Sequence, residues 1–151
     1  MSTVAKRILT PRTVKHADDS FVGTLGGLPY RANFRSLFEA LYPDPLGMTW
    51  VVRVHQRAAD FTTKQVNIYI PATLRDGEHN LPDTSSVRVE YVDYSIPEQP
   101  VSYRNTAGTI NFTLDKETRL ITGSISATLE SSQPRNRASL ELEINNFQVT
   151  G

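Results

Sequence analysis

Apolar and polar residues alternate in two runs, 109–114 and 120–129, on either side of a charged turn. Apolar side chains occupy one face of each run: Ile110, Phe112 and Leu114, then Ile121, Ile125, Ala127 and Leu129. The opposite face carries hydroxyl and amide side chains: Thr109, Asn111, Thr113, Ser124, Ser126 and Thr128. A period of two residues is that of a half-buried antiparallel strand. The segment therefore predicts a β-hairpin with one face in the core and the other in water.

The same alternation recurs along most of the chain, in residues 21–25, 28–34, 50–55, 65–70, 86–92 and 139–149. The inward positions are Trp50, Val52 and Val54; Val66, Ile68 and Ile70; Val87, Val89 and Tyr91; and Leu140, Leu142 and Ile144. Polar turns separate these segments, which is typical of antiparallel sandwiches and small barrels. We expect an all-β fold, an antiparallel β-sandwich or flattened barrel of about eight strands.

Two glycines interrupt the first alternating region. Gly26 and Gly27 join the runs 21–25 and 28–34, and a two-glycine connection is a common hairpin turn. Pro29 has no amide hydrogen to donate to a neighbouring strand. The strand that contains Pro29 is therefore expected at an edge of the sheet.

One segment departs from strand periodicity and predicts a helix. Ser36 and Glu39 have the spacing of a capping box, in which each side chain bonds the other residue's amide. Leu37 and Leu41 are four residues apart and would share one helical face. Prolines and a glycine follow at 43, 45 and 47. We therefore expect one short helix over 36–42, covering one end of the sheet.

The length of 151 residues fits a single compact domain. Residues 1–19 are rich in charge and are expected to be a polar, partly disordered lead-in, with one all-β domain over 20–151. Lys6 and Arg7 interrupt any apolar signal segment, and no apolar run approaches the roughly 20 residues that span a bilayer. These features favour a soluble, cytoplasmic protein with no membrane span.

Charge and cysteine content exclude several classes of function. Sixteen basic and sixteen acidic residues give a formal net charge of zero, so no overall field attracts nucleic acid or an anionic membrane. Basic residues gather in the first quarter of the chain, but no nucleic-acid motif accompanies them, and a nucleic-acid partner is not expected. Cysteine is absent, which excludes disulfides, thiol catalysis, thiolate metal sites and lipoprotein attachment.

Catalytic and metal-binding motifs are sparse. The loop that contains Asp76, Glu78 and His79 groups two carboxylates and an imidazole, so a cation site and an ordinary polar turn are both open there. His55 is expected to face solvent near Arg57. Ser124 lies within a strand pattern, without the sharp turn of a serine hydrolase nucleophile. No phosphate-binding loop or cofactor motif is present.

Candidate binding residues lie on turns and on the polar sheet face. Tyr69 and Tyr94 can offer aromatic surfaces, and the turn 131–139 projects Arg135 and Arg137. The favoured function is a non-enzymatic binding module whose partner is a protein, a glycan or a second copy through an edge strand. One alternative is a hydrolase that uses scattered carboxylates or His79. Another is a small-ligand carrier barrel, although the bulky inward residues favour a filled interior.

Five motifs occur in a suggestive order: residues 67–71, 76–81, 107–112, 121–126 and 144–147. In this order the chain resembles small bacterial all-β domains of unknown function, over about its last two thirds. It departs from that pattern at His79, where an aromatic residue is expected, and those relatives are often lipoproteins. The resemblance implies the fold and no activity.

Overall fold

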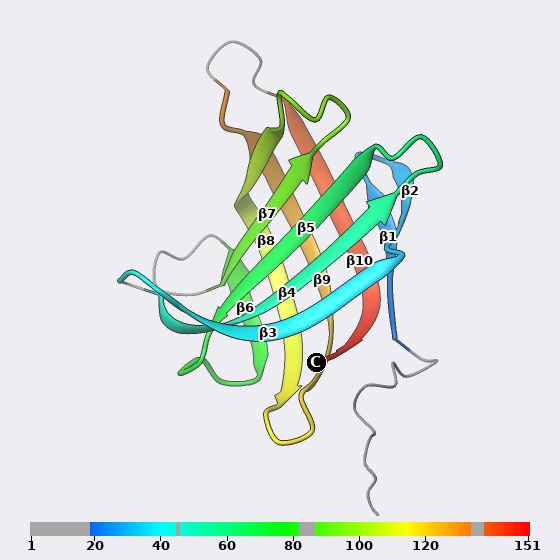
Figure 1. The fold of residues 1–151 in the computed structure, drawn as a ribbon. Helices are drawn as coiled ribbons and strands as arrows, with labels where there is room; N and C mark the ends of the chain where they lie inside the picture. The colour runs from blue at the N-terminus through cyan, green and yellow to red at the C-terminus, as the bar shows by residue number, and fades with distance from the viewer. Residues whose placement is uncertain (1–18, 45, 82–86, 134–137) are drawn as a thin grey trace, which may run out of the picture.

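The structure, a computed structural model, describes residues 19–44, 46–81, 87–133 and 138–151. Every regular element in these ranges is a β-strand (Figure 1). The strands are β1 (Ser20–Leu25), β2 (Leu28–Arg31), β3 (Phe34–Tyr42), β4 (Gly47–Arg57), β5 (Thr63–Pro71), β6 (Gly77–Leu81), β7 (Arg88–Asp93), β8 (Val101–Asp115), β9 (Leu120–Ser131) and β10 (Ser139–Thr150). The predicted all-β class is confirmed.

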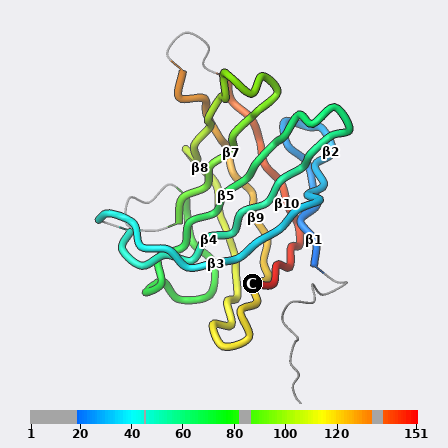
Figure 2. Tube along the Cα trace, viewed as in Figure 1, coloured from blue at the N-terminus to red at the C-terminus, as the bar shows by residue number. Residues whose placement is uncertain are grey.

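All ten strands belong to one antiparallel sheet with the order β2-β1-β10-β9-β8-β7-β5-β4-β3, and β6 pairs with β8 beside this path. The two end strands, β2 and β3, are joined by only Ala32 and Asn33. A two-residue link spans at most about 10 Å, whereas nine flat strands are roughly 40 Å wide. The sheet must therefore curl until its ends meet, which makes a flattened barrel and not a two-sheet sandwich (Figure 2).

Contacts on both sides of the β2–β3 link close the barrel. The hydroxyl of Tyr30 in β2 donates to the carbonyl oxygen of Lys64 in β5, at 2.8 Å. At the other end of β3, Glu39 forms an ion pair with Arg119 at 3.6 Å, and Arg119 lies 5.0 Å above the Trp50 ring. These side-chain contacts connect the two ends of the strand order, and they do so without a continuous row of backbone hydrogen bonds between β2 and β3.

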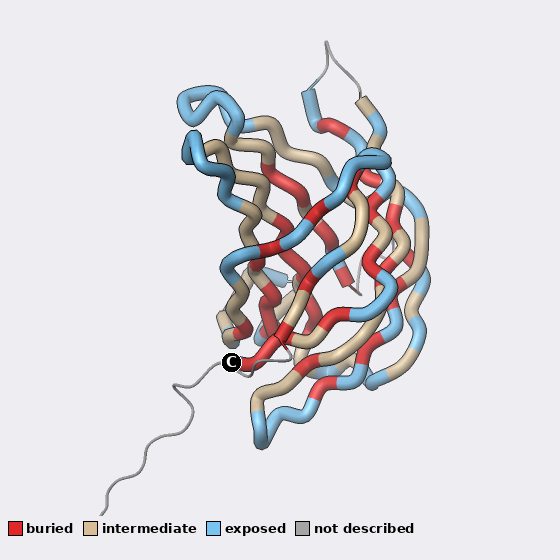
Figure 3. Tube along the Cα trace, turned by 90° about the vertical axis from the view of Figure 1, so that its right-hand side faces the viewer, coloured by how far each residue is buried: buried red, intermediate tan, exposed pale blue. Residues whose placement is uncertain are grey.

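The inward face of the sheet forms the core. The apolar rows predicted from alternation are buried in every strand that contains them, with Leu140 only partly so. Figure 3 shows buried positions alternating with exposed ones along the strands. The largest fully buried side chains are Tyr30, Phe21, Phe112 and Phe147. Burial of these rows supplies the main stabilisation, at about 25 cal/mol for each Å² of apolar surface removed from water.

The predicted glycine hairpin and edge proline are also confirmed. Gly26 and Gly27 both have positive φ, 61° and 79°, as a type I′ turn requires. Pro29 lies in β2, which ends the sheet, so its missing amide hydrogen breaks no ladder.

The predicted helix over 36–42 is wrong, because these residues form most of β3. All nine residues of β3 are in register with β4. The Ser36 hydroxyl donates to the carbonyl oxygen of Arg53 at 3.1 Å and caps no helix. Leu37 is buried, whereas Leu41 is 75% exposed near the β3–β4 turn. Pairing along a whole strand outweighs a two-residue capping signal, because helix propensity is only a weak local preference.

Ten strands replace the expected eight or so. The region 28–42 divides into β2 and β3, and β6 occupies part of the predicted turn 75–85. β6 pairs with β8 along its whole length, where Gly77 is opposite Phe112 and Leu81 is opposite Gly108. Its sequence has weak alternation because only Leu81 is fully buried in it.

Buried tyrosines predict a loss of stability in alkali. Burial raises the pKa of Tyr30 and of Tyr91 well above the ordinary value of 10.0. The folded state then holds these phenolic protons more tightly than the unfolded state, so the free energy of unfolding should fall as the pH rises above about 10. Urea titrations between pH 8 and pH 11 will measure this fall. Tyr30→Phe should make it shallower, and a flat profile in the wild-type protein would contradict the burial of these hydroxyls.

Candidate binding site

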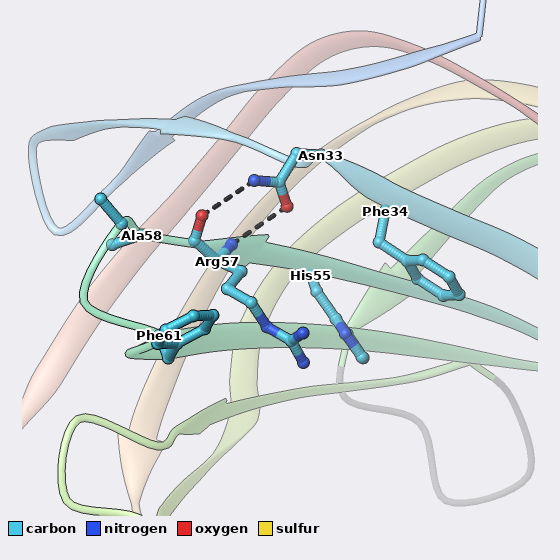
Figure 4. A pocket seen from close by; sticks show the side chains of 7 residues that line it. Asn33, Phe34, His55, Arg57, Ala58 and Phe61 are labelled. Atoms are coloured by element: carbon cyan, nitrogen blue, oxygen red, sulfur yellow. Dashed lines mark hydrogen bonds between the residues drawn. The ribbon is translucent and has the colours of Figure 1, made fainter.

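A surface pocket lies where the end of β4, the β4–β5 loop and the start of β3 meet (Figure 4). Its volume is about 560 Å³. The lining residues are Asn33, Phe34, His55, Arg57, Ala58, Ala59 and Phe61, and we call this site the rim pocket. Pockets of roughly 300–1,000 Å³ with apolar walls and a few polar groups are the usual form of small-molecule sites.

Two exposed phenylalanines form the walls of the rim pocket. Phe34 is 54% exposed and stacks on the His55 ring, with 5.1 Å between ring centroids and 29° between planes. Phe61 is 77% exposed on the β4–β5 loop. In Figure 4 the Arg57 side chain extends between Phe61 on one side and the His55–Phe34 pair on the other. The site therefore combines flat apolar surfaces with a guanidinium group.

The loop that presents Phe61 is held by its own hydrogen bonds. The amide of Ala58 donates to the carbonyl of Thr62 at 2.9 Å, and the amide of Phe61 donates to the carbonyl of Ala58 at 2.9 Å. Asp60 accepts from both the amide and the hydroxyl of Thr62, at 3.1 and 2.7 Å. Phe61 itself has a φ of 67°, a left-handed conformation that is uncommon and strained for a bulky side chain. The chain thus keeps a strained, exposed aromatic residue on a fixed loop.

Arg57 is fixed at its backbone and open at its side chain. Asn33 brackets it: the Asn33 amide nitrogen donates to the Arg57 carbonyl at 2.8 Å, and the Arg57 amide donates to Asn33 Oδ1 at 3.0 Å. The guanidinium Nε donates to the Thr63 hydroxyl at 3.4 Å. Among the described carboxylates, none forms an ion pair with Arg57. The positive charge of the pocket is therefore available to a ligand.

His55 contributes a neutral ring at neutral pH. Burial lowers its pKa below the ordinary value of 6.5, the Gln65 side chain opposes this shift, and the charges of Arg57 and Arg53 add to the lowering. Its Nε2 atom is buried and has no hydrogen-bond partner. A buried polar atom without a partner costs free energy until something satisfies it.

An NMR titration of the imidazole protons is expected to place the midpoint of His55 below pH 6.5. Because the fold disfavours the charged ring, the contribution of His55 to stability is lost as the pH falls below about 6.5. Arg57→Gln should move the midpoint upward but leave it below the ordinary value, since burial is the largest cause. A midpoint at or above 6.5 in the wild-type protein would show that the ring is open to water.

A second hollow of about 280 Å³, the polar groove, lies on the outer face of β6, β8, β9 and β10. It is lined by Glu78, Thr109, Asn111, Ser124, Ile125, Ser126, Glu143, Ile144 and Asn145. The polar face predicted for the 109–129 hairpin supplies four of these residues. One of them, Ser126, already donates its hydroxyl proton to Glu143 at 2.7 Å. The groove offers oxygen acceptors and amides and has no basic side chain in its lining.

The predicted cation loop has its three candidates in different surroundings. Asp76 accepts a hydrogen bond from the amide of Leu114 at 3.0 Å, and Glu78 lines the polar groove. His79 stacks on Phe112 with 5.5 Å between centroids, and its Nε2 lies 2.7 Å from the carbonyl oxygen of Arg75. The described part of the chain holds no group of three or more His, Cys, Asp or Glu side chains placed to bind a metal.

The predicted aromatic residues lie outside the rim pocket lining. Tyr69 is half-buried, donates its hydroxyl proton to Glu90 at 3.2 Å and meets the Tyr42 ring edge-on at 5.5 Å. Burial raises its pKa, with the Glu90 charge second. Tyr94 is half-buried, and its amide donates to the carbonyl of Thr63 at 2.9 Å, next to the hydroxyl that Arg57 contacts. Arg135 and Arg137 lie outside the described residues.

Sequence reasoning missed the residues that dominate the rim pocket. Alternation assigns Phe34 to a strand but to neither of its faces, and Phe61 lies within a polar turn. Two signals were available: an aromatic residue inside a polar loop, and the outward position of His55 next to two arginines. The meeting of Phe34 with His55 depends on the register of β3 on β4, where the helix prediction failed.

Within the described residues, no helix has the length and apolar character needed to cross a bilayer. Comparison of the chain with models of known families, with curated proteins and with solved structures finds no match in any of the three.

Proposed function

We propose that this protein is a non-enzymatic binding module that holds a small ligand in the rim pocket. The observation that carries the proposal is the placement of Phe34 and Phe61, both more than half exposed, on either side of Arg57. The exposed part of each ring adds no hydrophobic burial to the fold, and Phe61 also occupies a left-handed backbone conformation. Strained backbone and exposed aromatic surface are features of binding sites.

The composition of the pocket favours binding over catalysis. Its lining contains amide, aromatic, aliphatic and guanidinium groups, and only His55 among them exchanges a proton near neutral pH. Neither a carboxylate nor a hydroxyl is part of the lining, so the hydrolase alternative has no nucleophile or acid there. The carrier-barrel alternative is disfavoured because bulky inward residues such as Phe112 and Ile144 are fully buried in the core.

A protein-detected NMR screen tests the proposal. Small aromatic and aliphatic fragments, both neutral and charged, are added to the ¹⁵N-labelled full chain. Amide shifts should cluster at residues 33–34 and 55–63. Shifts that cluster around core residues, or no saturable shifts with any fragment, would overturn the assignment of the rim pocket as the binding site.

The polar groove supports a second candidate, the binding of a neutral glycan. Thr109, Asn111 and Ser124 present hydroxyl and amide groups side by side, and Glu78 and Glu143 add acceptors for sugar hydroxyls. Titration with cellotetraose and chitotetraose should then shift residues 109–111 and 124–126, and Asn111→Ala should weaken binding. No shift with either sugar, or shifts unaffected by Asn111→Ala, would remove this candidate.

We also propose that the chain is related to small bacterial all-β domains, on the basis of the turn and strand motifs in the second half of the chain.

Self-association through an edge strand also stays a prediction. The edge of β3 is partly occupied, since Gly151 lies so close to Leu37 that an added Cβ would be 2.7 Å from the Leu37 carbonyl oxygen. Size-exclusion chromatography with mass measurement tests self-association.

A further inference from the structure

We propose that the ligand of the rim pocket is a small aromatic oxyanion: a flat ring that carries a carboxylate or a phosphate group. This inference rests on the proposed function and names the chemical class of its ligand. It follows from the shape of the pocket walls, from the charge between them and from the rigidity of the elements that hold both.

The walls select a flat, apolar group. Phe34 and His55 stack nearly parallel, with 29° between their planes, and the two stacked rings make one wall of the pocket. Phe61 stands across Arg57 from that wall, as Figure 4 shows, and Ala58 and Ala59 complete the lining with short side chains. Aromatic rings pair favourably at centroid distances of roughly 4.5–7 Å, in stacked or edge-on arrangements.

The charge of the pocket selects an anion. Arg57 has no described ion-pair partner, and its guanidinium forms a planar fork that matches carboxylate and phosphate oxygens. Asp60, the nearest acid in sequence, has an oxygen bound by the Thr62 amide and hydroxyl. These hydrogen bonds lower the pKa of Asp60, and no ion pair joins Asp60 to Arg57.

Hydrogen bonds fix the backbone of the rim pocket before any ligand arrives. The paired hydrogen bonds between Asn33 and Arg57 join the start of β3 to the end of β4. The Gln56 side chain accepts from the Arg31 amide at 2.6 Å and adds a second link beside them. Loop residues 58–62 are closed by their own bonds. Little backbone entropy then remains to be lost on binding.

Matched naphthalene probes test the inference, with dissociation constants measured by NMR shift titration at pH 7. The probes are 2-naphthoate, 2-naphthyl phosphate and the neutral 2-naphthalenemethanol, which share one ring system. The two anions should bind at least tenfold more tightly than the neutral probe, as expected for a charge-assisted bond. Comparing the two anions shows whether carboxylate or phosphate is preferred.

Arg57→Gln should remove this preference and leave the neutral probe unchanged. Arg75→Gln serves as the matched control, because Arg75 is exposed on the distant β5–β6 turn and should not alter any constant. Fold integrity is checked from the amide spectrum of each variant. If Arg57→Gln disturbs that spectrum, Arg57→Lys keeps the charge without the fork and should retain part of the preference.

The outcomes separate this inference from the proposed function. If all three probes bind the rim pocket equally and Arg57→Gln changes nothing, the binding module stands and the oxyanion class is overturned. If none of the probes binds there, although the fragment screen finds a ligand for the pocket, the aromatic class is wrong. If nothing binds in either experiment, the proposed function itself fails.

Discussion

Phe61→Asn is expected to make the protein more stable and at the same time to weaken ligand binding in the rim pocket at least tenfold. Phe61 has a φ of 67° and is 77% exposed. A bulky residue in the left-handed region costs roughly 1–2 kcal/mol, whereas asparagine adopts that conformation readily. The free energy of unfolding should therefore rise by about 1 kcal/mol. Binding of 2-naphthoate should weaken at least tenfold, because one aromatic wall is lost.

Phe61→Ala separates the two effects. Alanine also lacks the aromatic ring, so binding should weaken as much as in Phe61→Asn. It keeps a Cβ at the same positive φ, so the gain in stability should be absent. Urea unfolding and NMR titration of both variants measure the two quantities. Ile96→Ala, which shortens another exposed apolar side chain, provides the control for general loss of surface. Equal stability of the Asn and Ala variants would mean that the loop stores no backbone strain.

Gly108→Ala is expected to destabilise the barrel by about 3 kcal/mol or more. An added Cβ would lie 2.1 Å from the Ser126 carbonyl oxygen and 2.7 Å from the Cα of Ala127. Both atoms belong to the backbone of β9, which is paired on its other side with β10 and cannot move alone. Gly108 also has a φ of 124°, which a residue with a side chain rarely adopts.

Gly27→Ala is the matched control for that substitution. Gly27 also has a positive φ, 79°, but no atom lies within 4 Å of its added Cβ. Its cost should be limited to the backbone term, about 1 kcal/mol. The difference between the two losses of stability, measured by thermal and urea unfolding, therefore gives the cost of the clash between an added Cβ on β8 and the backbone of β9. Equal losses of stability would show that β8 and β9 lie farther apart at Gly108 than in this structure.

The fold was largely predictable because core positions follow a period of two. Residues such as Val52, Ile68 and Phe112 are buried where alternation placed them, since one face of each strand meets the core. The strand β3 could not be predicted in this way, because Ser36 and Glu39 satisfy a local rule for a helix start. Its pairing with β4 depends on residues that are distant in sequence. A short-range pattern does not report such a partner.

The rim pocket was beyond sequence reasoning for a related reason. Phe34, Arg57 and Phe61 come from a strand start, a strand end and a loop, and the pairing of β3 with β4 brings Phe34 to the other two. Their types carry no catalytic or metal-binding pattern, so no motif search would select them. The polar groove was more accessible, because Thr109, Asn111 and Ser124 share one face of a predicted hairpin. A surface that lies on one predicted hairpin can be inferred from periodicity, whereas one that depends on the pairing of two strands and on a loop conformation cannot.

Intermolecular nuclear Overhauser effects between bound 2-naphthoate and the protein give the most direct test of the rim pocket. The naphthalene protons should show effects to the ring protons of both Phe34 and Phe61, and none to those of Phe112 in the core. Effects to Phe112 or to residues of the polar groove, with none to Phe34 and Phe61, would place the ligand elsewhere and contradict a binding site at this end of the barrel.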